Sequence, residues 1–506
     1  MSLTVQHLAA VDLGSNSFRM LVGKAAESPH GAQIYPLDSL REPVRLGAGL
    51  DASKNLTEES QQRALDALRR FGERLRRFHP ERVRAVATNA VRVAKNAASF
   101  LPRAQEALGF PIEVIAGREE ARLVYIGAAH SVAPAAGNRL VVDIGGGSTE
   151  FIIGSGLEPR IMESLYIGCV SMSREFFPAG RVDAHRMQSA VLAARREVQI
   201  IARDFRKAGW TSAVGSSGTA RALADILVGS QLNDSAASLG ITRTGLRRLR
   251  KLYVQAEDLA TLRLPGLKSD RLAVAAGGLA IMLAVFEELG LKEMEATDAG
   301  LRLGVLYDLL GREQRQDMRD LTVQQFMQRY MVDGGQAARV EQLALQLLEQ
   351  IDPAATQECR QSLRWAARLH EMGLSISHAA YHKHSAYIAA NADMPGFSRS
   401  EQATMAEMLL CHGGKLKKLG ALPGSSIDLR ALLVLRLAVL LARNRHDIDP
   451  RGLRLLPGPH GVSGTRIEVD ARWLRSSPLT QYSLEQEVAE WQRVGFDMEL
   501  HALPGG

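Results

Sequence analysis

The chain has 506 residues, more than one hydrophobic core usually supports, so its length predicts a multidomain protein. Its 46% hydrophobic and 23% charged residues are ordinary for a globular protein and exclude overall disorder. The net charge of +7 favours a polyanionic ligand, although the same charge could serve solubility alone.

The sequence carries no obvious sign of export or of a membrane anchor. Cys169, Cys359 and Cys411 lack the spacing of a disulfide frame or a zinc site, which favours a reducing compartment, and we expect the cytoplasm. The first residues lack both a basic region and a long apolar stretch, so we expect no signal peptide. The apolar segment 272–286 is shorter than the ~20 residues that span a bilayer, and it predicts a buried helix.

The first 150 residues alternate between predicted strands and helices. Apolar residues at 7–12 and 18–24 predict a hairpin, and Thr57, followed by Glu58 and Glu59, predicts the start of a helix. Further along we expect a strand at 83–87, a helix from about 97, a strand at 112–115, a helix from 118 and a strand at 140–144. This order is typical of α/β layering.

An internal repeat strengthens this interpretation. Residues 11–17, Val-Asp-Leu-Gly-Ser-Asn-Ser, return 131 residues later as Val-Asp-Ile-Gly-Gly-Gly-Ser at 142–148. Each copy is followed by another apolar strand, at 18–22 and at 151–153. Two similar α/β domains that face one another would place the two acidic turns on opposite walls of one cleft.

The second half of the chain has a different pattern. Residues 321–445 show helical periodicity almost throughout and predict an all-α domain. The segment 450–464, rich in proline and glycine, predicts a boundary before a small α+β domain with elements at 466–474, 484–494 and 497–503. We therefore expect four domains, at 1–130, 131–312, 313–448 and 449–506.

The two repeated turns suit a phosphate. Small residues let backbone N–H groups approach phosphate oxygens together, and hydroxyl groups add further donors. Asp12 and Asp143, at the ends of the two strands, cannot bind phosphate themselves but suit a hard divalent cation. One glycine turn after a strand is common, whereas two matched copies favour a site.

Six segments resemble the exopolyphosphatase and guanosine pentaphosphate phosphatase family in order and spacing. They are DLGSNSFRM at 12–20, ATNAVRVAKN at 87–96, AGREEARL at 116–123, VDIGGGSTEF at 142–151, VGSSGTARAL at 214–223 and TDAGLRLGVLYDLL at 297–310. The segment 367–398 extends the likeness to the longer bacterial members, most of all the long exopolyphosphatases.

The resemblance implies an actin, hexokinase and Hsp70-like (ribonuclease H-like) fold for the first two domains, with the active site between them. It implies dependence on Mg²⁺ or Mn²⁺, held by Asp12, Asp143 and Glu150, and is compatible with stimulation by a monovalent cation such as K⁺. Glu120 would be the general base, with Asp143 and Glu150 beside it in catalysis. Glu119 would point about 100° away on the same helix and is a poor substitute.

The residues expected to bind phosphate come from several of the matching segments. They are Ser15, Asn16, Asn89, Arg92, Gly145, Gly146, Gly147, Ser148, Thr149 and Arg271. Arg92 suits charge on a phosphoryl group because a guanidinium can bind two oxygens at once. Arg271 could instead cap a helix at the surface, and whether residues 215–219 bind a ligand or only close the cleft is left open.

The helical domain resembles a degenerate His-Asp phosphohydrolase fold. Glu371 follows His370 where that fold needs Asp, which argues against a second metal centre. We expect a groove for the distal part of the anion, although a solvated basic face is the competing interpretation. The groove residues would be His378, His382, Lys383, Lys415 and Lys418.

The sequence therefore predicts an exopolyphosphatase, a hydrolase that releases the terminal phosphate of inorganic polyphosphate. The alternative is hydrolysis of guanosine pentaphosphate to guanosine tetraphosphate; a non-catalytic sensor of polyphosphate or of these nucleotides, and a kinase of the same fold, belong to other classes. The resemblance also suggests a homodimer. We expect no nucleic-acid partner and no transmembrane segment, and the basic charge is compatible with peripheral membrane association.

Overall fold

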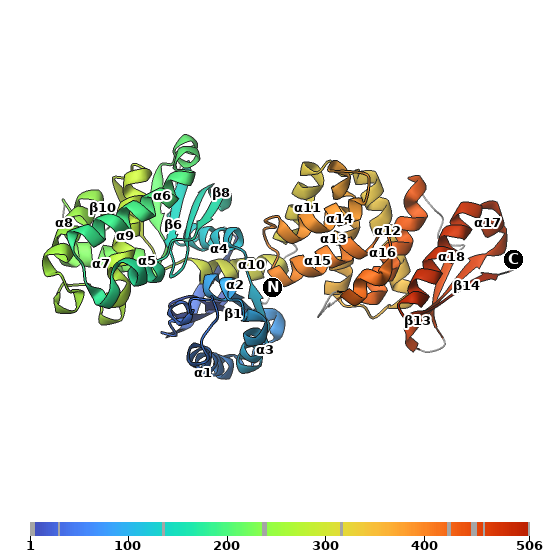
Figure 1. Cartoon of the computed structure of the whole chain (residues 1–506), viewed down its shortest axis with the longest axis horizontal. Coiled ribbons are helices and arrows are strands. Elements are labelled where there is room, and N and C mark those ends of the chain that lie inside the picture. Colours follow the sequence, from blue (N-terminus) through green and yellow to red (C-terminus); the bar gives the residue numbers. More distant parts are fainter. Residues whose placement is uncertain are drawn as a thin grey trace. The chain divides into compact units, whose positions relative to one another are not determined.

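The computed structural model describes residues 6–28, 31–133, 137–234, 240–313, 317–421, 427–446, 453–458 and 461–503. The chain divides into two compact units, Met1–Asp317 and Met318–Gly506, which we describe one at a time. Figure 1 labels their helices and strands in chain order. The finer division into four domains stays a prediction.

The first sheet of unit 1 has five strands in the order β3-β2-β1-β4-β5. They are β1 (Gln6–Leu13), β2 (Phe18–Ser28), β3 (Gly31–Glu42), β4 (Val83–Ala87) and β5 (Ile112–Val114). The predicted hairpin is confirmed, since β1 pairs with β2 in antiparallel orientation. The sequence patterns did not predict β3, an edge strand with mixed polar and apolar residues.

The second sheet has six strands in the order β10-β11-β9-β6-β7-β8. They are β6 (Asn138–Ile144), β7 (Thr149–Ser155), β8 (Glu158–Leu165), β9 (Ser212–Gly215), β10 (Ile241–Thr242) and β11 (Glu293–Ala296). Read from the other edge, the order β8-β7-β6-β9-β11 corresponds to β3-β2-β1-β4-β5 in the first sheet. In both sheets three antiparallel strands form a meander, and two further strands continue it in parallel orientation.

The repeat extends to the pairing of individual residues. Asp12 lies opposite Arg19 in the first hairpin, and Asp143 lies opposite Glu150, at the equivalent position, in the second. Both hairpins lead into a register shift at the same place, between Val22 and Gly23 in β2 and between Ile153 and Gly154 in β7. The two α/β halves are thus built on one plan, as the repeat predicts.

Ten α-helices of unit 1 lie in the described ranges. They are α1 (Glu58–Leu75), α2 (Asn89–Val93), α3 (Ala97–Leu108), α4 (Gly117–Ala129), α5 (Cys169–Phe176), α6 (Ala184–Ala208), α7 (Gly218–Gly229), α8 (Arg243–Ala256), α9 (Leu272–Glu288) and α10 (Leu301–Glu313). Helix α1 starts as predicted, because the side chain of Thr57 accepts a hydrogen bond from the amide of Ser60.

Helices α4 and α10 join the two halves. Helix α4 packs against β7 and β8 of the second sheet, α10 packs against β1 and β2 of the first, and the two helices pack against each other. Gly127 of α4 lies against the carbonyl of Gly300, and Gly304 of α10 lies against the carbonyl of Leu123, so closely that a side chain at either glycine would collide with the neighbouring backbone. The glycines let the two helices meet backbone to backbone.

Helix α9 confirms the expectation of a buried helix. The segment Ser269–Glu288 is long and apolar enough to cross a membrane by composition. In unit 1, however, α9 packs against α5 and α6, and Leu279, Ile281 and Val285 are fully buried in the core. Its apolar character is therefore explained by packing inside the unit.

Unit 2 is helical over its first part, as its sequence pattern predicts. Its elements are α11 (Met318–Arg329), α12 (Gly334–Ile351), α13 (Gln357–Leu369), α14 (Tyr381–Asn391), α15 (Arg399–Cys411), α16 (Leu429–Leu441), β12 (Leu453–Gly458), β13 (Gly461–Asp470), α17 (Ala471–Ser476), α18 (Pro478–Arg493) and β14 (Asp497–Leu503). The three strands form one sheet in the order β12-β13-β14. The likeness of the helices to a His-Asp phosphohydrolase fold stays a prediction.

The proline- and glycine-rich segment needs a correction. Pro457, Gly458, Gly461 and Gly464 belong to β12 and β13, so the segment is partly sheet and not only a boundary. A register shift between Pro457 and Gly458 lets proline stand at the end of the antiparallel pair. Residues 447–452 and 459–460, which include Pro450, Gly452 and Pro459, lie outside the described residues.

Candidate active site

A cleft of about 510 Å³ lies between the two halves of unit 1. The turn after β1 and the turn after β6 both line it. A Cβ atom on Gly146 would lie 2.9 Å from the Cβ of Ser15 and 3.4 Å from the amide nitrogen of Asn16. The two repeated turns thus face each other across the cleft at van der Waals distance, as the sequence predicts.

Four carboxyl groups gather at this place. Asp12, Glu120 and Asp143 line the cleft. Glu150 lies directly behind it, opposite Asp143 in the sheet, where its Oε1 accepts a hydrogen bond of 2.9 Å from the hydroxyl of Ser164. The arrangement brings together all four acids that the sequence singled out.

These carboxyl groups are short of cationic partners. Burial and the charge of Glu120 raise the pKa of Asp143 to about 8, and burial raises the pKa of Asp12 to about 6. Burial raises the pKa of Glu120 as well, and burial followed by Glu120 and Asp143 raises the pKa of Glu150 well above its usual value. Such shifts in a cleft are typical of a functional site.

Two polar atoms in the cleft lack a partner within the described part of the chain. Asp12 Oδ1 and Asn89 Nδ2 are both buried without a hydrogen bond. A buried polar atom with no partner costs free energy, so it usually marks a ligand position or a functional strain. One of these atoms is an acceptor and the other a donor, which suits a cation and an anion side by side.

The donor set fits a hard divalent cation. Within the described residues, no three His, Cys, Asp or Glu side chains are arranged to hold an ion by themselves. Magnesium seldom needs such a cage, because it is commonly bound by one or two carboxylates together with water and substrate phosphate. Asp12 and Asp143 line the cleft and can supply those carboxylates, with Glu150 behind Asp143.

The other side of the cleft is basic. Arg19, Arg271 and Arg302 line it, and burial followed by neighbouring arginines lowers the pKa of Arg271 and of Arg302. A cavity of about 260 Å³, which shares these three arginines, extends the basic surface to Arg41, Arg221 and Lys268. Crowded guanidinium groups of this kind favour an anion between them.

The sequence predicted Arg271 but missed Arg19 and Arg302. Both belong to segments that carry the family resemblance, and Arg19 stands opposite Asp12 in the first hairpin. This pairing could have identified Arg19 from the sequence, because a residue opposite Asp12 in the hairpin lies at the same end of the sheet as Asp12. Arg302 could not be found in this way, since it reaches the cleft from the start of α10.

Most of the predicted phosphate ligands line the cleft. They are Ser15, Asn16, Asn89, Gly145, Gly146, Gly147, Ser148 and Arg271. Residues 216–219, whose role was left open, also line it, and Ser216 Oγ donates a hydrogen bond of 3.2 Å to Asp143 Oδ2. This loop therefore contributes to the site and orients one of its acids.

Two predicted ligands are placed elsewhere. The Arg92 side chain is only 3% exposed, and its Nη1 donates to Glu120 Oε2 at 3.1 Å and to the carbonyl of Ile115 at 2.8 Å. Arg92 thus orients Glu120 from behind and does not line the cleft. Thr149 is fully buried and its hydroxyl donates to the carbonyl of Ile167 at 2.6 Å, so that group serves the fold.

Glu119 is directed away from the cleft, as the helical geometry predicts. It is 2% exposed and accepts two hydrogen bonds of 2.8 Å from Arg122. Adjacent glutamates on α4 thus have different surroundings, and only Glu120 faces the cleft.

In unit 2 the predicted groove residues His382 and Lys418 both lie beside Gly414. His378 and Lys383 are exposed, and Lys415 lines a separate cavity of about 1130 Å³. Lys418 Nζ donates to the carbonyls of Leu410 and Gly413, and burial together with Lys418 lowers the pKa of His382 to about 4. His382 is therefore uncharged at neutral pH, and the groove for the distal part of the anion stays a prediction.

Comparisons with known proteins agree with the site. Residues 25–313 match the Ppx/GppA phosphatase family, and residues 318–488 match domain III of the Ppx/GppA phosphatases. Two curated relatives, both named guanosine-5'-triphosphate,3'-diphosphate pyrophosphatase, are similar over nearly the whole chain. The one from Vibrio vulnificus is 35% identical over 98% of both chains, and the one from Vibrio campbellii is 36% identical over 97% of both.

Solved structures point to the same family. An exopolyphosphatase from Cytophaga hutchinsonii is 25% identical, with a TM-score of 0.53, over 60% of this chain and 98% of its own. A Ppx/GppA family member from Aquifex aeolicus is 26% identical, with a TM-score of 0.50, over 61% of this chain and 99% of its own. The α/β architecture of unit 1 is the one the resemblance implied. The chain belongs to the Ppx/GppA phosphatase family and is a hydrolase of phosphoanhydride bonds.

Proposed function

We propose that this enzyme hydrolyses the terminal 5′-phosphate of guanosine 5′-triphosphate 3′-diphosphate and releases orthophosphate and guanosine tetraphosphate. The names of the Vibrio relatives, similar over almost the whole chain, support this substrate over the polyphosphate that the sequence first favoured. The observation that carries the proposal is the polarity of the cleft, acidic at Asp12, Glu120 and Asp143 and basic at Arg19, Arg271 and Arg302.

Glu120 acts as the general base in this proposal. Its carboxylate lines the cleft at the start of α4, and burial raises its pKa, which makes it a better proton acceptor than an exposed glutamate. Arg92 holds Oε2 from behind, so the other oxygen is left to face a water molecule in the cleft. The water would lose its proton to Glu120 as its oxygen attacks the terminal phosphorus, and the bond from that phosphorus to the bridging oxygen would break, so that guanosine tetraphosphate leaves with the bridging oxygen and orthophosphate is formed.

The two repeated turns hold the phosphoryl group. Ser15 and Asn16 offer donors from one wall, and Gly145 to Gly147 offer backbone N–H groups from the other. The unpartnered Nδ2 of Asn89 is a further donor. These groups orient the phosphorus for attack and stabilise the charge on its oxygens, which are the main requirements of phosphoryl transfer.

We propose Mg²⁺ or Mn²⁺ as the cofactor, held by Asp12 and Asp143 with Glu150 in support. Their raised pKa values and the unpartnered Oδ1 of Asp12 support a cation there, since a positive charge would offset the repulsion among these acids. Such an ion neutralises charge on the phosphoanhydride when it is bound.

The basic side would hold the remainder of the substrate. A nucleotide with phosphates at both its 5′ and 3′ positions presents two separate anionic groups. Arg19, Arg271 and Arg302 offer cationic surface beyond the reacting phosphate. Farther along, Arg41 is paired with Asp270, and Arg221 with Asp225 and Asp298. This surface supports a substrate with charge at both ends.

Inorganic polyphosphate is the second candidate. A solved relative is named an exopolyphosphatase, and a linear chain of phosphates could also extend from the acidic end of the cleft along the basic side. Attack on the terminal phosphoanhydride would use the same residues. A kinase is disfavoured because Glu120 is placed for water, and family membership sets the non-catalytic sensor aside.

The test is a phosphate-release assay on the purified chain with Mg²⁺. It compares guanosine 5′-triphosphate 3′-diphosphate, long-chain polyphosphate and GTP, and includes GTP because it lacks the 3′-diphosphate. We expect the highest kcat/KM for the first substrate. A higher kcat/KM for polyphosphate would replace this proposal with the second candidate, and equal values for GTP would show that the 3′-diphosphate is not recognised.

Stimulation by K⁺, a homodimer, peripheral membrane association and a cytoplasmic location stay predictions from the sequence. Each can be checked on the intact protein.

A further inference from the structure

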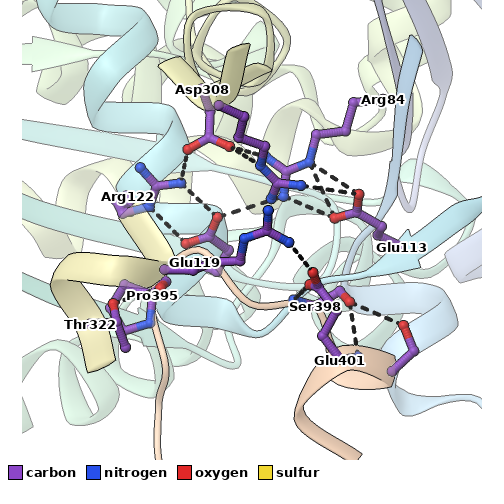
Figure 2. Close-up of polar contacts among 12 residues, drawn as sticks. Arg84, Glu113, Glu119, Arg122, Asp308, Thr322, Pro395, Ser398 and Glu401 are labelled. Atoms are coloured by element: carbon purple, nitrogen blue, oxygen red, sulfur yellow. Dashed lines mark hydrogen bonds and ion pairs between the residues drawn. The ribbon is translucent and has the colours of Figure 1, made fainter. Parts of the chain in front are cut away.

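Unit 1 contains a buried cluster of alternating charges, and Figure 2 shows Arg84, Glu113, Glu119, Arg122 and Asp308 directed toward one another. Asp308 of α10 is at its centre, where Oδ1 accepts a hydrogen bond from Arg122 and Oδ2 accepts one of 2.7 Å from Arg84. Arg122 also binds Glu119 on α4, and Arg84 also binds Glu113 on β5 at 2.9 Å. We call these residues, with Arg312, the Asp308 cluster.

The Asp308 cluster is balanced in charge. Three guanidinium groups, Arg84, Arg122 and Arg312, meet three carboxylates, Glu113, Glu119 and Asp308. The side chains of Arg84, Arg122 and Glu119 are at most 3% exposed. A buried ion pair of this kind adds little net stability over an apolar pair, but the loss of one member leaves a buried charge unmatched. Its geometry is therefore held firmly.

All members of the Asp308 cluster except Glu113 stand on an element that carries a residue of the cleft or leads directly into one. Glu119 immediately precedes Glu120 on the first turn of α4. Arg84 stands on β4, which leads directly into Thr88 and Asn89. Asp308 stands on α10, whose first turn carries Arg302.

The backbone allows these three elements little freedom to slide. Helices α4 and α10 touch through Gly127 and Gly304, so their separation is fixed by the backbone. Strand β4 is held between β1 and β5 by the sheet. Asp308 adds a direct link from α10 to both neighbours, because it binds Arg84 on β4 and Arg122 on α4.

We propose that Asp308 is a positioning residue for the reaction. By binding Arg84 and Arg122 it holds the Glu120 carboxylate, the Asn89 donor and the Arg302 guanidinium in one register around the reacting phosphate. It touches neither substrate nor water itself. The proposal rests on the proposed function, since it assumes that Glu120 is the base.

Substitution of Asp308 by Asn tests the proposal. Because a displacement of about 1 Å can cost on the order of 100-fold in rate, we expect kcat to fall by about 10- to 100-fold while KM for guanosine 5′-triphosphate 3′-diphosphate changes by less than about threefold. Arg92 would also meet Glu120 differently, so the acid limb of the kcat–pH profile should shift.

The unbalanced cluster could prevent Asp308→Asn from folding. The double variant Asp308→Asn/Arg312→Gln removes one charge of each sign and keeps the remaining cluster neutral. It still lacks the carboxylate that joins α10 to Arg84 and Arg122. We expect the double variant to fold and to show the same loss of kcat.

Glu288→Gln is the matched control. Glu288 is also a buried carboxylate of unit 1, paired with Arg195 at 2.6 Å, but it stands at the end of α9, and neither residue lines the cleft. It should lower the thermal midpoint of unfolding with kcat within about twofold of the wild type. Equal losses of kcat in Glu288→Gln and the double variant would overturn the proposal, and so would a folded double variant with wild-type kcat and pH profile.

The variant Glu120→Gln separates the hypothesis that Glu120 is the base from the hypothesis that Asp308 positions it. If Glu120→Gln keeps its activity, the proposed role of Glu120 fails, whatever the Asp308 variants do. If Glu120→Gln is inactive and the double variant is fully active, only the positioning role of Asp308 fails.

Discussion

Two groups of buried acids lie side by side in unit 1, and they differ in their partners. Glu113, Glu119 and Asp308 meet three arginines, and despite burial these arginines lower the pKa of Asp308 and of Glu113. Among the acids of the cleft, only Glu120 forms an ion pair with a described residue, namely Arg92. The pKa values of the cleft acids are raised. Glu119 and Glu120, adjacent in sequence, belong one to each group.

The difference shows how one residue type can serve structure and chemistry within a few ångströms. A carboxylate with matched cations stays ionised and holds elements together. A carboxylate without them accepts a proton or a cation more readily, which a hydrolase of anions requires. The number of arginines within reach decides between these roles.

The largest test of this comparison is a pair of isosteric substitutions on α4. Glu120→Gln should lower kcat by about 1,000-fold, because an amide cannot accept the proton from water. Glu119→Gln should lower kcat by no more than about tenfold, since its effect on Glu120 is indirect. Phosphate release from guanosine 5′-triphosphate 3′-diphosphate measures both, and similar losses in the two variants would contradict the division.

A second test compares the same substitution in the two groups. Without divalent cation at pH 7.5, Asp143→Asn should raise the free energy of unfolding of unit 1 by about 1–2 kcal/mol, because it removes a carboxyl group that is ionised in the unfolded chain but that burial makes costly to ionise in the folded state. Asp308→Asn should lower it by about 3 kcal/mol, because it leaves buried arginines unmatched.

The reporter for this test is Trp210, which lies in unit 1, whereas the other three tryptophans of the chain lie in unit 2. The difference in fluorescence between each variant and the same variant with Trp210→Phe follows urea unfolding of unit 1. The gain from Asp143→Asn should shrink toward pH 4, where the carboxyl group of the unfolded chain also binds its proton and the difference between the two states decreases. If both substitutions raised, or both lowered, the free energy of unfolding of unit 1 at pH 7.5, the distinction between the two groups of acids would be wrong.

A smaller effect should separate the two units between pH 7.5 and 5.5. Burial lowers the pKa of His370 and His412, and the pKa of His382 is lowered to about 4. Unfolded histidine binds a proton near pH 6.5, so the unfolded state gains protons first and unit 2 should lose about 1 kcal/mol of stability by pH 5.5 for each histidine that stays neutral when folded.

Unit 1 should respond in the opposite direction. The raised pKa of Asp143 means that the folded state binds a proton as the pH falls from 8, so repulsion in the cleft decreases. The lowered pKa of Asp308 keeps that carboxylate charged throughout this range, and its contribution is lost only below about pH 4. Urea unfolding of Trp210→Phe follows unit 2, and an unchanged midpoint at pH 5.5 would count against buried neutral histidines.

Much of this site could be predicted from local patterns. The repeated Asp-x-Gly turns predicted that Asp12 and Asp143 would meet, because equivalent strand ends of two similar sheets face one cleft. Helical geometry predicted that Glu119 and Glu120 would face different ways. Family resemblance added Asn89 and Arg271, which no pattern alone would have selected.

The remainder depends on contacts between distant segments. Arg92 looked like a phosphate ligand because its residue type suits one, but its neighbours in space, Glu120 and Ile115, were not visible in the sequence. The partners of Asp308 lie 186 and 224 residues away along the chain, and no periodicity reports such pairs. The choice between nucleotide and polyphosphate also came from relatives, since the same turns suit either anion.

In the proposed function, the pairing of Asp12 with Arg19 and of Asp143 with Glu150 would orient the substrate in the cleft. The two equivalent hairpins differ at one cross-strand pair, where the residue opposite the aspartate is positively charged in the first hairpin and negatively charged in the second. An elongated anion that enters between them meets attraction at one end and, without a metal ion, repulsion at the other. On that proposal, one difference between the duplicated hairpins would orient the substrate, and an exchange of the charges at residues 19 and 150 should reduce the preference for cleaving one end of the anion.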